Sequence, residues 1–139
     1  MTDRELLEAA ARACGGVLSQ GTGKRRTGDS WDSWEWYGPL GILMLDGRVT
    51  YPLTDDGDAL RLAVKLNLHA MRSSSLCVEC YGEKAPFDSD GPHSSTWRSL
   101  ARCWFGDGVP PEVEAERDQL AATRRAIVRA AATVGAGKE

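Results

Sequence analysis

The sequence lacks an excess of positive charge, a long hydrophobic run and a catalytic signature. Its 17 basic and 20 acidic residues give a formal net charge of −3, so no bulk electrostatic attraction draws it to nucleic acid or to an anionic membrane. The longest apolar run, Leu40 to Leu45, is far shorter than a membrane span. The acidic opening Met1 to Glu5 enters a helix at once, so we expect no secretory signal peptide. The predicted partners are therefore neither nucleic acid nor membrane.

The size and composition are those of a globular protein. The 139 residues suffice for one domain with a single hydrophobic core, and the sequence contains no internal repeat and no linker between domains. Four cysteines without an export signal indicate reduced thiols in a cytosol. We predict one α+β domain over residues 1–139, with helices packed on a small antiparallel β-sheet.

Capping signals predict three helices. Thr2 and Glu5 form a capping box that starts the first helix, and Gly15-Gly16 ends it. Asp55 or Thr54 caps the second helix. Its apolar positions span a wide arc, which favours a helix lying flat on the sheet: Leu60, Leu62, Ala63, Val64, Leu66 and Leu68. The third helix runs from about Glu112 to Val134, with Pro111 as its first residue and Leu120, Ile127, Ala131 and Val134 as its core positions.

Alternating patterns and turn residues predict the strands. Trp31–Tyr37 alternates as a strand, and Asp46-Gly47 is typical of a two-residue turn between strands at Leu40–Leu45 and Arg48–Tyr51. Leu76–Tyr81 is a further strand. These four segments make up the predicted sheet.

Three segments are not assigned to this sheet. Glycine-rich Ser19–Ser30 predicts a mobile loop between two strands, and Gly82–Pro92 is rich in proline, glycine and aspartate and predicts a loop. In Ser95–Phe105 the aromatic residues suit a helix face and a strand equally, so both assignments stay open.

Three blocks in combination carry a family resemblance: Thr2–Cys14, Pro52–Leu66 and Ala122–Ala132. They resemble the phage ABA sandwich domain proteins, which are small bacteriophage and prophage products. The resemblance covers roughly half of the chain and leaves residues 73–110 as a candidate family-divergent insertion. It implies a phage-encoded protein acting in the host cytoplasm, with helices packed on an antiparallel sheet. It implies no catalytic residues.

A weak candidate metal site consists of cysteines and one histidine: Cys77, Cys80, His93 and Cys103. Structural zinc takes four such ligands in a tetrahedron, and Cys77 with Cys80 supplies one pair. The sequence offers no second tight pair, and a strand would point these two cysteines to opposite faces. Buried thiols acting as small apolar groups are therefore favoured over zinc, and we predict no cofactor.

The predicted binding surface joins a basic loop to an aromatic strand: Lys24, Arg25, Arg26, Trp31, Trp34, Trp36 and Tyr37. Aromatic and arginine side chains dominate protein interfaces, and alternation prevents the strand from burying all its rings on one face. Core packing explains most tryptophans in a chain this small, and a solvated loop explains the basic residues. Gly21 to Lys24 lacks the spacing of a phosphate-binding P-loop.

Three functions remain open. The favoured one is a non-enzymatic phage protein that inhibits a host antiviral defence component through protein–protein contact. This step rests on the resemblance and on analogy between folds. The alternatives are a protein that sequesters a nucleotide or second messenger, and a small nucleotide-processing enzyme. The corresponding partner is a host protein or a nucleotide-like small molecule, and the oligomeric state is left open.

Overall fold

The structure is a computed structural model that describes residues 2–21, 23–26, 34–37, 39–83, 97–106, 108–109 and 114–137. For residues 23–26, 34–37 and 83 it describes the backbone alone. The chain has an α+β fold, as the sequence predicts. The helices are α1 (Asp3–Cys14), α2 (Asp56–Leu66) and α3 (Gln119–Ala136). The strands are β1 (Val17–Gln20), β2 (Gly23–Arg26), β3 (Trp34–Tyr37), β4 (Leu40–Leu43), β5 (Val49–Thr50), β6 (His69–Ser74), β7 (Cys77–Glu83), β8 (Trp97–Phe105) and β9 (Ala115–Glu116).

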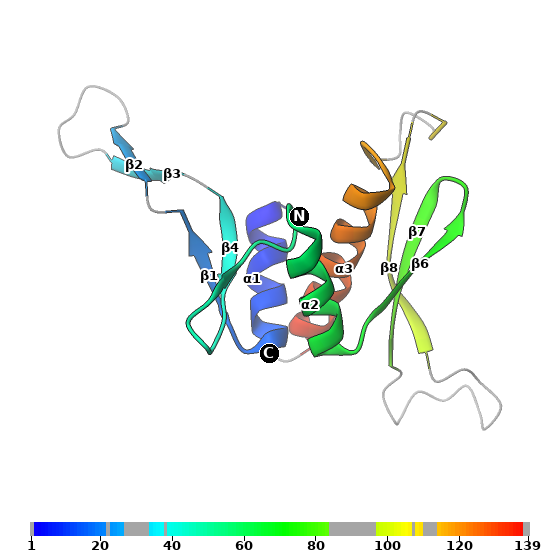
Figure 1. The fold of residues 1–139 in the computed structure, drawn as a ribbon, viewed down its shortest axis with the longest axis horizontal. Coiled ribbons are helices and arrows are strands. Elements are labelled where there is room, and N and C mark those ends of the chain that lie inside the picture. Colours follow the sequence, from blue (N-terminus) through cyan, green and yellow to red (C-terminus); the bar gives the residue numbers. More distant parts are fainter. Residues whose placement is uncertain are drawn as a thin grey trace.

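The helices form a layer between two sheets, as Figure 1 shows. One sheet has the strand order β1-β4-β5 and packs on α1, and the other has the order β6-β7-β8-β9 and packs on α3. Strands β2 and β3 form a separate two-stranded ribbon. The single predicted sheet is therefore wrong, because its strands belong to three different sheets. Helix α2 separates β5 from β6 along the chain, and the strands before and after it cover opposite sides of the helical layer.

Helix α1 begins and ends where its local signals predict. The Thr2 hydroxyl accepts a hydrogen bond from the Glu5 N–H at 3.2 Å, and the Glu5 carboxylate accepts one from the Thr2 N–H at 2.9 Å. Gly15 has a φ of +77° at the C-terminal end, which glycine adopts without steric cost. The predicted capping box and helix end are confirmed.

The β4–β5 hairpin is present, but its turn differs from the predicted one. The Met44 N–H donates to the Arg48 carbonyl at 2.8 Å, so three residues form the loop between them. Gly47 has a φ of +86°, whereas Asp46 is not in the left-handed region. A two-residue type I′ turn needs positive φ at both central residues, and the three-residue loop needs it at the glycine alone.

Helix α2 buries a narrower face than predicted. Asp55 caps it, accepting a hydrogen bond from the Asp58 N–H at 2.9 Å. Leu62 and Ala63 are buried, whereas Leu60 is 62% exposed, and Val64 on the same outer face is also exposed. The helix packs against α1 and α3, and it does not lie flat on a sheet. A neighbouring helix covers a narrower stripe of its partner than a sheet does.

Helix α3 starts later than predicted. The carboxylate of Asp118 caps it, accepting a hydrogen bond from the Ala121 N–H at 2.9 Å. Strand β9 precedes the cap and occupies part of the predicted helix. Strand β9 pairs with β8, so those backbone groups form sheet hydrogen bonds instead. Pro111, the predicted first residue, lies outside the described residues.

The core positions of α3 are partly as predicted. Ile127 and Ala131 are buried, Val134 is half-buried, and Leu120 is 60% exposed in the first turn.

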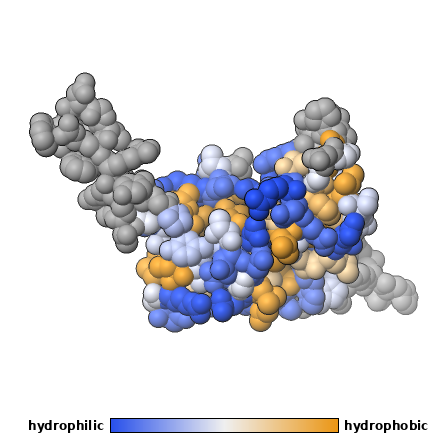
Figure 2. Space-filling view, turned by 45° about the horizontal axis from the view of Figure 1, so that its top comes forward, coloured by the Kyte–Doolittle hydropathy of each residue, from blue (hydrophilic) through white to orange (hydrophobic). Residues whose placement is uncertain are grey.

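On the surface of the molecule, hydrophobic patches interrupt the otherwise hydrophilic face drawn in Figure 2. No helix in the described part of the chain is both long and apolar enough to cross a membrane.

The second sheet contains two strands that the sequence did not assign. Strand β6 was not predicted, and β8 settles the open assignment of Ser95–Phe105 in favour of a strand. Strand β7 begins one residue after the predicted position and continues into Gly82, which was predicted as loop. Strands β7 and β8 lie inside residues 73–110, and the status of that range as an insertion stays a prediction.

Candidate functional site

The predicted basic and aromatic segments are neighbouring strands. In the antiparallel pair β2–β3, Lys24 lies opposite Trp36 and Arg26 lies opposite Trp34. The residues at 23–26 are therefore a strand, and not part of a mobile loop as predicted. Their side chains and that of Tyr37 lie outside the described residues, and so does the whole of Trp31. The structure brings the two backbones together, and the binding role of these residues stays a prediction.

The cysteines of the candidate metal site are buried free thiols in the second sheet. Cys80 and Cys103 belong to the core cluster shared with the helices, whereas Cys77 lies outside that cluster. Burial, with a smaller effect of the nearby Cys103, raises the pKa of Cys80 to about 12. Burial also raises the pKa of Cys103. Redox nucleophiles are thiolates, so these environments disfavour redox chemistry. The preference for buried thiols over zinc stays a prediction.

No group of three metal-binding side chains occurs in the part of the chain that the structure describes. His93, the remaining candidate ligand, lies outside the described residues.

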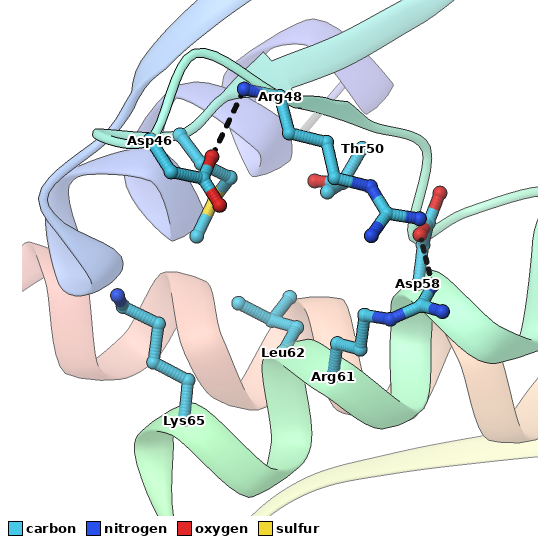
Figure 3. Close-up of a pocket in the computed structure, with 8 residues that line it drawn as sticks. Asp46, Arg48, Thr50, Asp58, Arg61, Leu62 and Lys65 are labelled. Carbon is cyan, nitrogen blue, oxygen red and sulfur yellow. Dashed lines mark hydrogen bonds and ion pairs between the residues drawn. The ribbon is translucent and has the colours of Figure 1, made fainter.

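A cleft between the β4–β5 hairpin and α2, which follows it in the chain, gathers charged side chains from both elements (Figure 3). Its volume is about 220 Å³. The hairpin contributes Met44, Asp46, Arg48 and Thr50, and α2 contributes Asp58, Arg61, Leu62 and Lys65. The α2 residues are spaced by three, one and three positions, so they lie on one face of the helix. We call this site the cationic cleft.

Asp58 fixes one end of the cationic cleft. This residue is 7% exposed, and its carboxylate accepts a hydrogen bond from the Tyr51 N–H at 2.9 Å. The same carboxylate pairs with the Arg61 guanidinium at 2.8 Å. It thereby ties the end of the hairpin to the first turn of α2. It also restrains Arg61 beside the cleft, so this arginine needs little reordering to bind a ligand.

Arg48 and Lys65 are the other cations of the cationic cleft, which two carboxylates, Asp46 and Asp58, also line. Asp46 accepts a hydrogen bond from the backbone N–H of Arg48 at 2.9 Å, which stabilises the turn. The Arg48 side chain extends toward the end of the cleft where Asp58 and Arg61 lie, and Lys65 lies at the opposite end (Figure 3). Within the described residues, neither the Arg48 guanidinium nor the Lys65 ammonium forms an ion pair. The cleft can therefore offer two unpaired cations to an anion.

The remaining wall of the cationic cleft is apolar or already hydrogen-bonded. Leu62 is buried and Met44 is half-buried. The Thr50 hydroxyl donates to the Ile42 carbonyl at 3.4 Å, so its proton is engaged. No histidine or cysteine belongs to the described lining. This arrangement is suited to holding an anion and offers no activated nucleophile.

Sequence reasoning missed the cationic cleft. At the start of α2 the sequence predicts a cap at Asp55 or Thr54, and Asp55 is the cap. The available signal was the spacing of Asp58, Arg61 and Lys65, which predicts one charged helix face. The sequence does not reveal that Arg48 lies across from that face.

Comparison with known proteins finds no matching family, no similar curated protein and no similar solved structure. The resemblance to the phage ABA sandwich domain proteins therefore rests on the sequence blocks alone and stays a prediction.

Proposed function

We propose that the protein acts by binding, and that the cationic cleft holds a phosphate or carboxylate group of a small ligand. The observation that carries this proposal is that three cationic side chains line one small cleft, two of them (Arg48 and Lys65) without an ion pair among the described residues. Arg48 extends toward the end of the cleft where Arg61 lies, and Lys65 lies at the other end (Figure 3). Guanidinium and ammonium groups bind such anions through charge-assisted hydrogen bonds. This is the chemistry of the sequestering function predicted from the sequence.

The size of the cationic cleft supports a small anionic group over a large ligand. Its volume of about 220 Å³ is below the roughly 300–1,000 Å³ of sites that enclose a drug-sized molecule. The cleft would therefore enclose the charged group, while the rest of the ligand stays outside. Met44 and Leu62 would contact the first apolar atoms next to that group.

The wider biological role remains the prediction made from the resemblance. In that prediction a phage protein works in the host cytoplasm and inhibits a defence component, by contact with a host protein or by withdrawing a nucleotide messenger. The cationic cleft fits the second route, because nucleotides carry phosphates. The first route depends on Trp31 and the other residues of the β2–β3 region, whose side chains are not described.

Calorimetry on the purified full chain at low salt tests the cleft. The probes are inorganic phosphate, pyrophosphate and ribose 5-phosphate, with ribose as the uncharged comparison. We expect the anions to bind, and Arg48→Gln or Lys65→Gln to weaken that binding about tenfold. A hydrogen bond to a charged group is worth about 1.5 kcal/mol or more, which corresponds to that factor. Raising the salt concentration should weaken binding further.

The matched control is Arg117→Gln, which removes an arginine whose side chain is 85% exposed outside the cleft. It should leave anion affinity unchanged. Equal affinities for the parent and for the Arg48→Gln, Lys65→Gln double variant would overturn the proposal, as would the failure of every anion to bind. Thermal unfolding of each variant checks that the fold is retained.

A further inference from the structure

The second sheet has an aromatic hollow on the face turned away from the helices. His69, Met71, Tyr81 and Trp97 line it, and its volume is about 420 Å³. On the opposite face, the row Ala70, Cys80 and Ala101 packs into the core with the helices. His69 lies opposite Tyr81 in the next row of the register, so its side chain points to the other face.

The composition of this hollow is unusual for its position. The outer face of an antiparallel sheet that covers a core is normally polar. Here three rings from three neighbouring strands and the thioether of Met71 line the hollow, and Met71 is 56% exposed. The rings of His69 and Trp97 meet edge to face, with centroids 4.3 Å apart and an angle of 66° between their planes. The outer face of the sheet therefore carries a cluster of aromatic and apolar groups in place of a polar surface.

A polar network beside the hollow fixes Tyr81. The phenol donates a hydrogen bond to the Glu79 carboxylate, and this bond raises the pKa of Tyr81. Glu79 is 8% exposed and also accepts a hydrogen bond from Ser99. Arg102 pairs with the same carboxylate at 3.2 Å. The network thus restrains the tyrosine and leaves its ring in the lining of the hollow.

The same network removes one source of negative charge from the hollow. A site for an alkylammonium cation combines aromatic rings with unneutralised negative charge. The carboxylate nearest to Tyr81 is neutralised by Arg102, and the described lining contains no other acidic residue. The described lining of the hollow is aromatic and apolar. Such a surface favours stacking of a flat, uncharged ring.

We propose that the aromatic hollow on the outer face of β6, β7 and β8 binds a flat heteroaromatic ring, such as the base of a nucleoside. The volume of about 420 Å³ falls within the range of small-molecule sites. This site shares no residue with the cationic cleft, so the proposal goes beyond the proposed function and does not depend on it.

Titration of the full chain by calorimetry, with saturation-transfer NMR to identify the bound atoms, tests the hollow. The probes are adenosine, choline and cyclohexanol. We expect adenosine to bind through its base and the other two to bind far more weakly. Trp97→Leu should weaken adenosine binding about 5- to 150-fold, because stacking on an aromatic side chain contributes roughly 1–3 kcal/mol per base. Trp97→Phe should retain most of the affinity.

Two further variants separate stacking from a loss of structure. Met71→Ser changes an exposed wall of the hollow without touching the core, and should weaken adenosine binding several-fold. Val64→Ala changes an exposed apolar residue on α2 and should leave it unchanged. Adenosine affinity should also survive the Arg48→Gln, Lys65→Gln double variant. Preference for choline, absence of adenosine binding, or full affinity in both Trp97→Leu and Met71→Ser would overturn the proposal.

Discussion

At the scale of single residues, two buried carboxylates stabilise local contacts. One lies beside the first sheet and the other lies in the second sheet. Asp58 joins the end of the first sheet's hairpin to α2. Glu79 lies in β7 and receives hydrogen bonds from Ser99, Tyr81 and Ser73, with the charge of Arg102 beside it. Together these contacts outweigh burial and lower the pKa of Glu79 below its ordinary value of 4.5. In each case an anion removed from water is satisfied by several donors, as buried charges require.

The lowered pKa of Glu79 predicts an acid-sensitive contribution to stability. Because the pKa is lower in the folded state, ionised Glu79 stabilises the fold above about pH 4.5, and this stabilisation is lost as the pH falls through the folded-state value. Glu79→Gln should lower the free energy of unfolding by about 1–3 kcal/mol at pH 7, with a smaller difference at pH 3. Urea unfolding of the parent and of Glu79→Gln at a series of pH values measures the difference in the free energy of unfolding at each pH.

A control for net charge is Glu8→Gln, which removes a carboxylate from an exposed pair on α1. It should change stability little, because exposed ion pairs contribute about 0–1 kcal/mol. A difference between the parent and Glu79→Gln that stays constant from pH 7 to pH 3 would contradict the assigned role of Glu79.

At the scale of elements, α1 and α3 approach one another through small residues. Ala9, Ala10 and Ala13 of α1 are buried, and on α3 Gly135 lies directly against the backbone of α1. A Cβ at Gly135 would overlap the carbonyl oxygen of Ala9. The absence of that atom sets the distance between the two helices. Because both neighbours in the contact are backbone groups, a larger side chain requires the helices themselves to move.

Gly135→Ala should therefore destabilise the protein, although alanine is the better helix former. Overpacking a close contact costs typically about 1–3 kcal/mol. The control is Gly137→Ala, two residues further on, where a Cβ would make only ordinary contacts and φ is −74°. This control should be neutral or slightly stabilising. Urea unfolding of the two variants distinguishes the cases, and equal effects would refute the role of the helix contact.

At the scale of the whole molecule, α3 is packed between the other helices and the second sheet. It contacts α1, α2 and the second sheet, and its central alanines and Val128 are fully buried. Arg125 of α3 pairs with Asp3 at the start of α1 at 2.9 Å and with Glu116 of β9 at 2.6 Å. The helix thus connects the beginning of the chain to the second sheet. By contrast with α3, the two-residue strands β5 and β9 each lie at the edge of a sheet, where they have one neighbouring strand.

Hydrogen exchange should reflect this arrangement. We expect the amides of residues 126–132 in α3 to exchange most slowly, because they open only when the helical layer separates from the second sheet. The amides of β5 and β9 should exchange much faster. Exchange measured by NMR at neutral pH tests this order. Protection of β9 equal to that of α3 would show that the second sheet opens as one unit with the helix.

What the sequence determined on its own is the local part of this protein. The Thr2–Glu5 capping box, the end of α1 at Gly15, the Asp55 cap and the strands beside Asp46-Gly47 follow from contacts within a few residues, and the α+β class follows from them. Only the tertiary structure decided how the strands divide between two sheets and which side of α2 is buried. It alone placed Arg48 at the end of the cleft where Asp58 and Arg61 lie, and His69 beside Trp97. The physical reason is that these arrangements depend on packing between segments distant in the chain, for which residue spacing carries no signal.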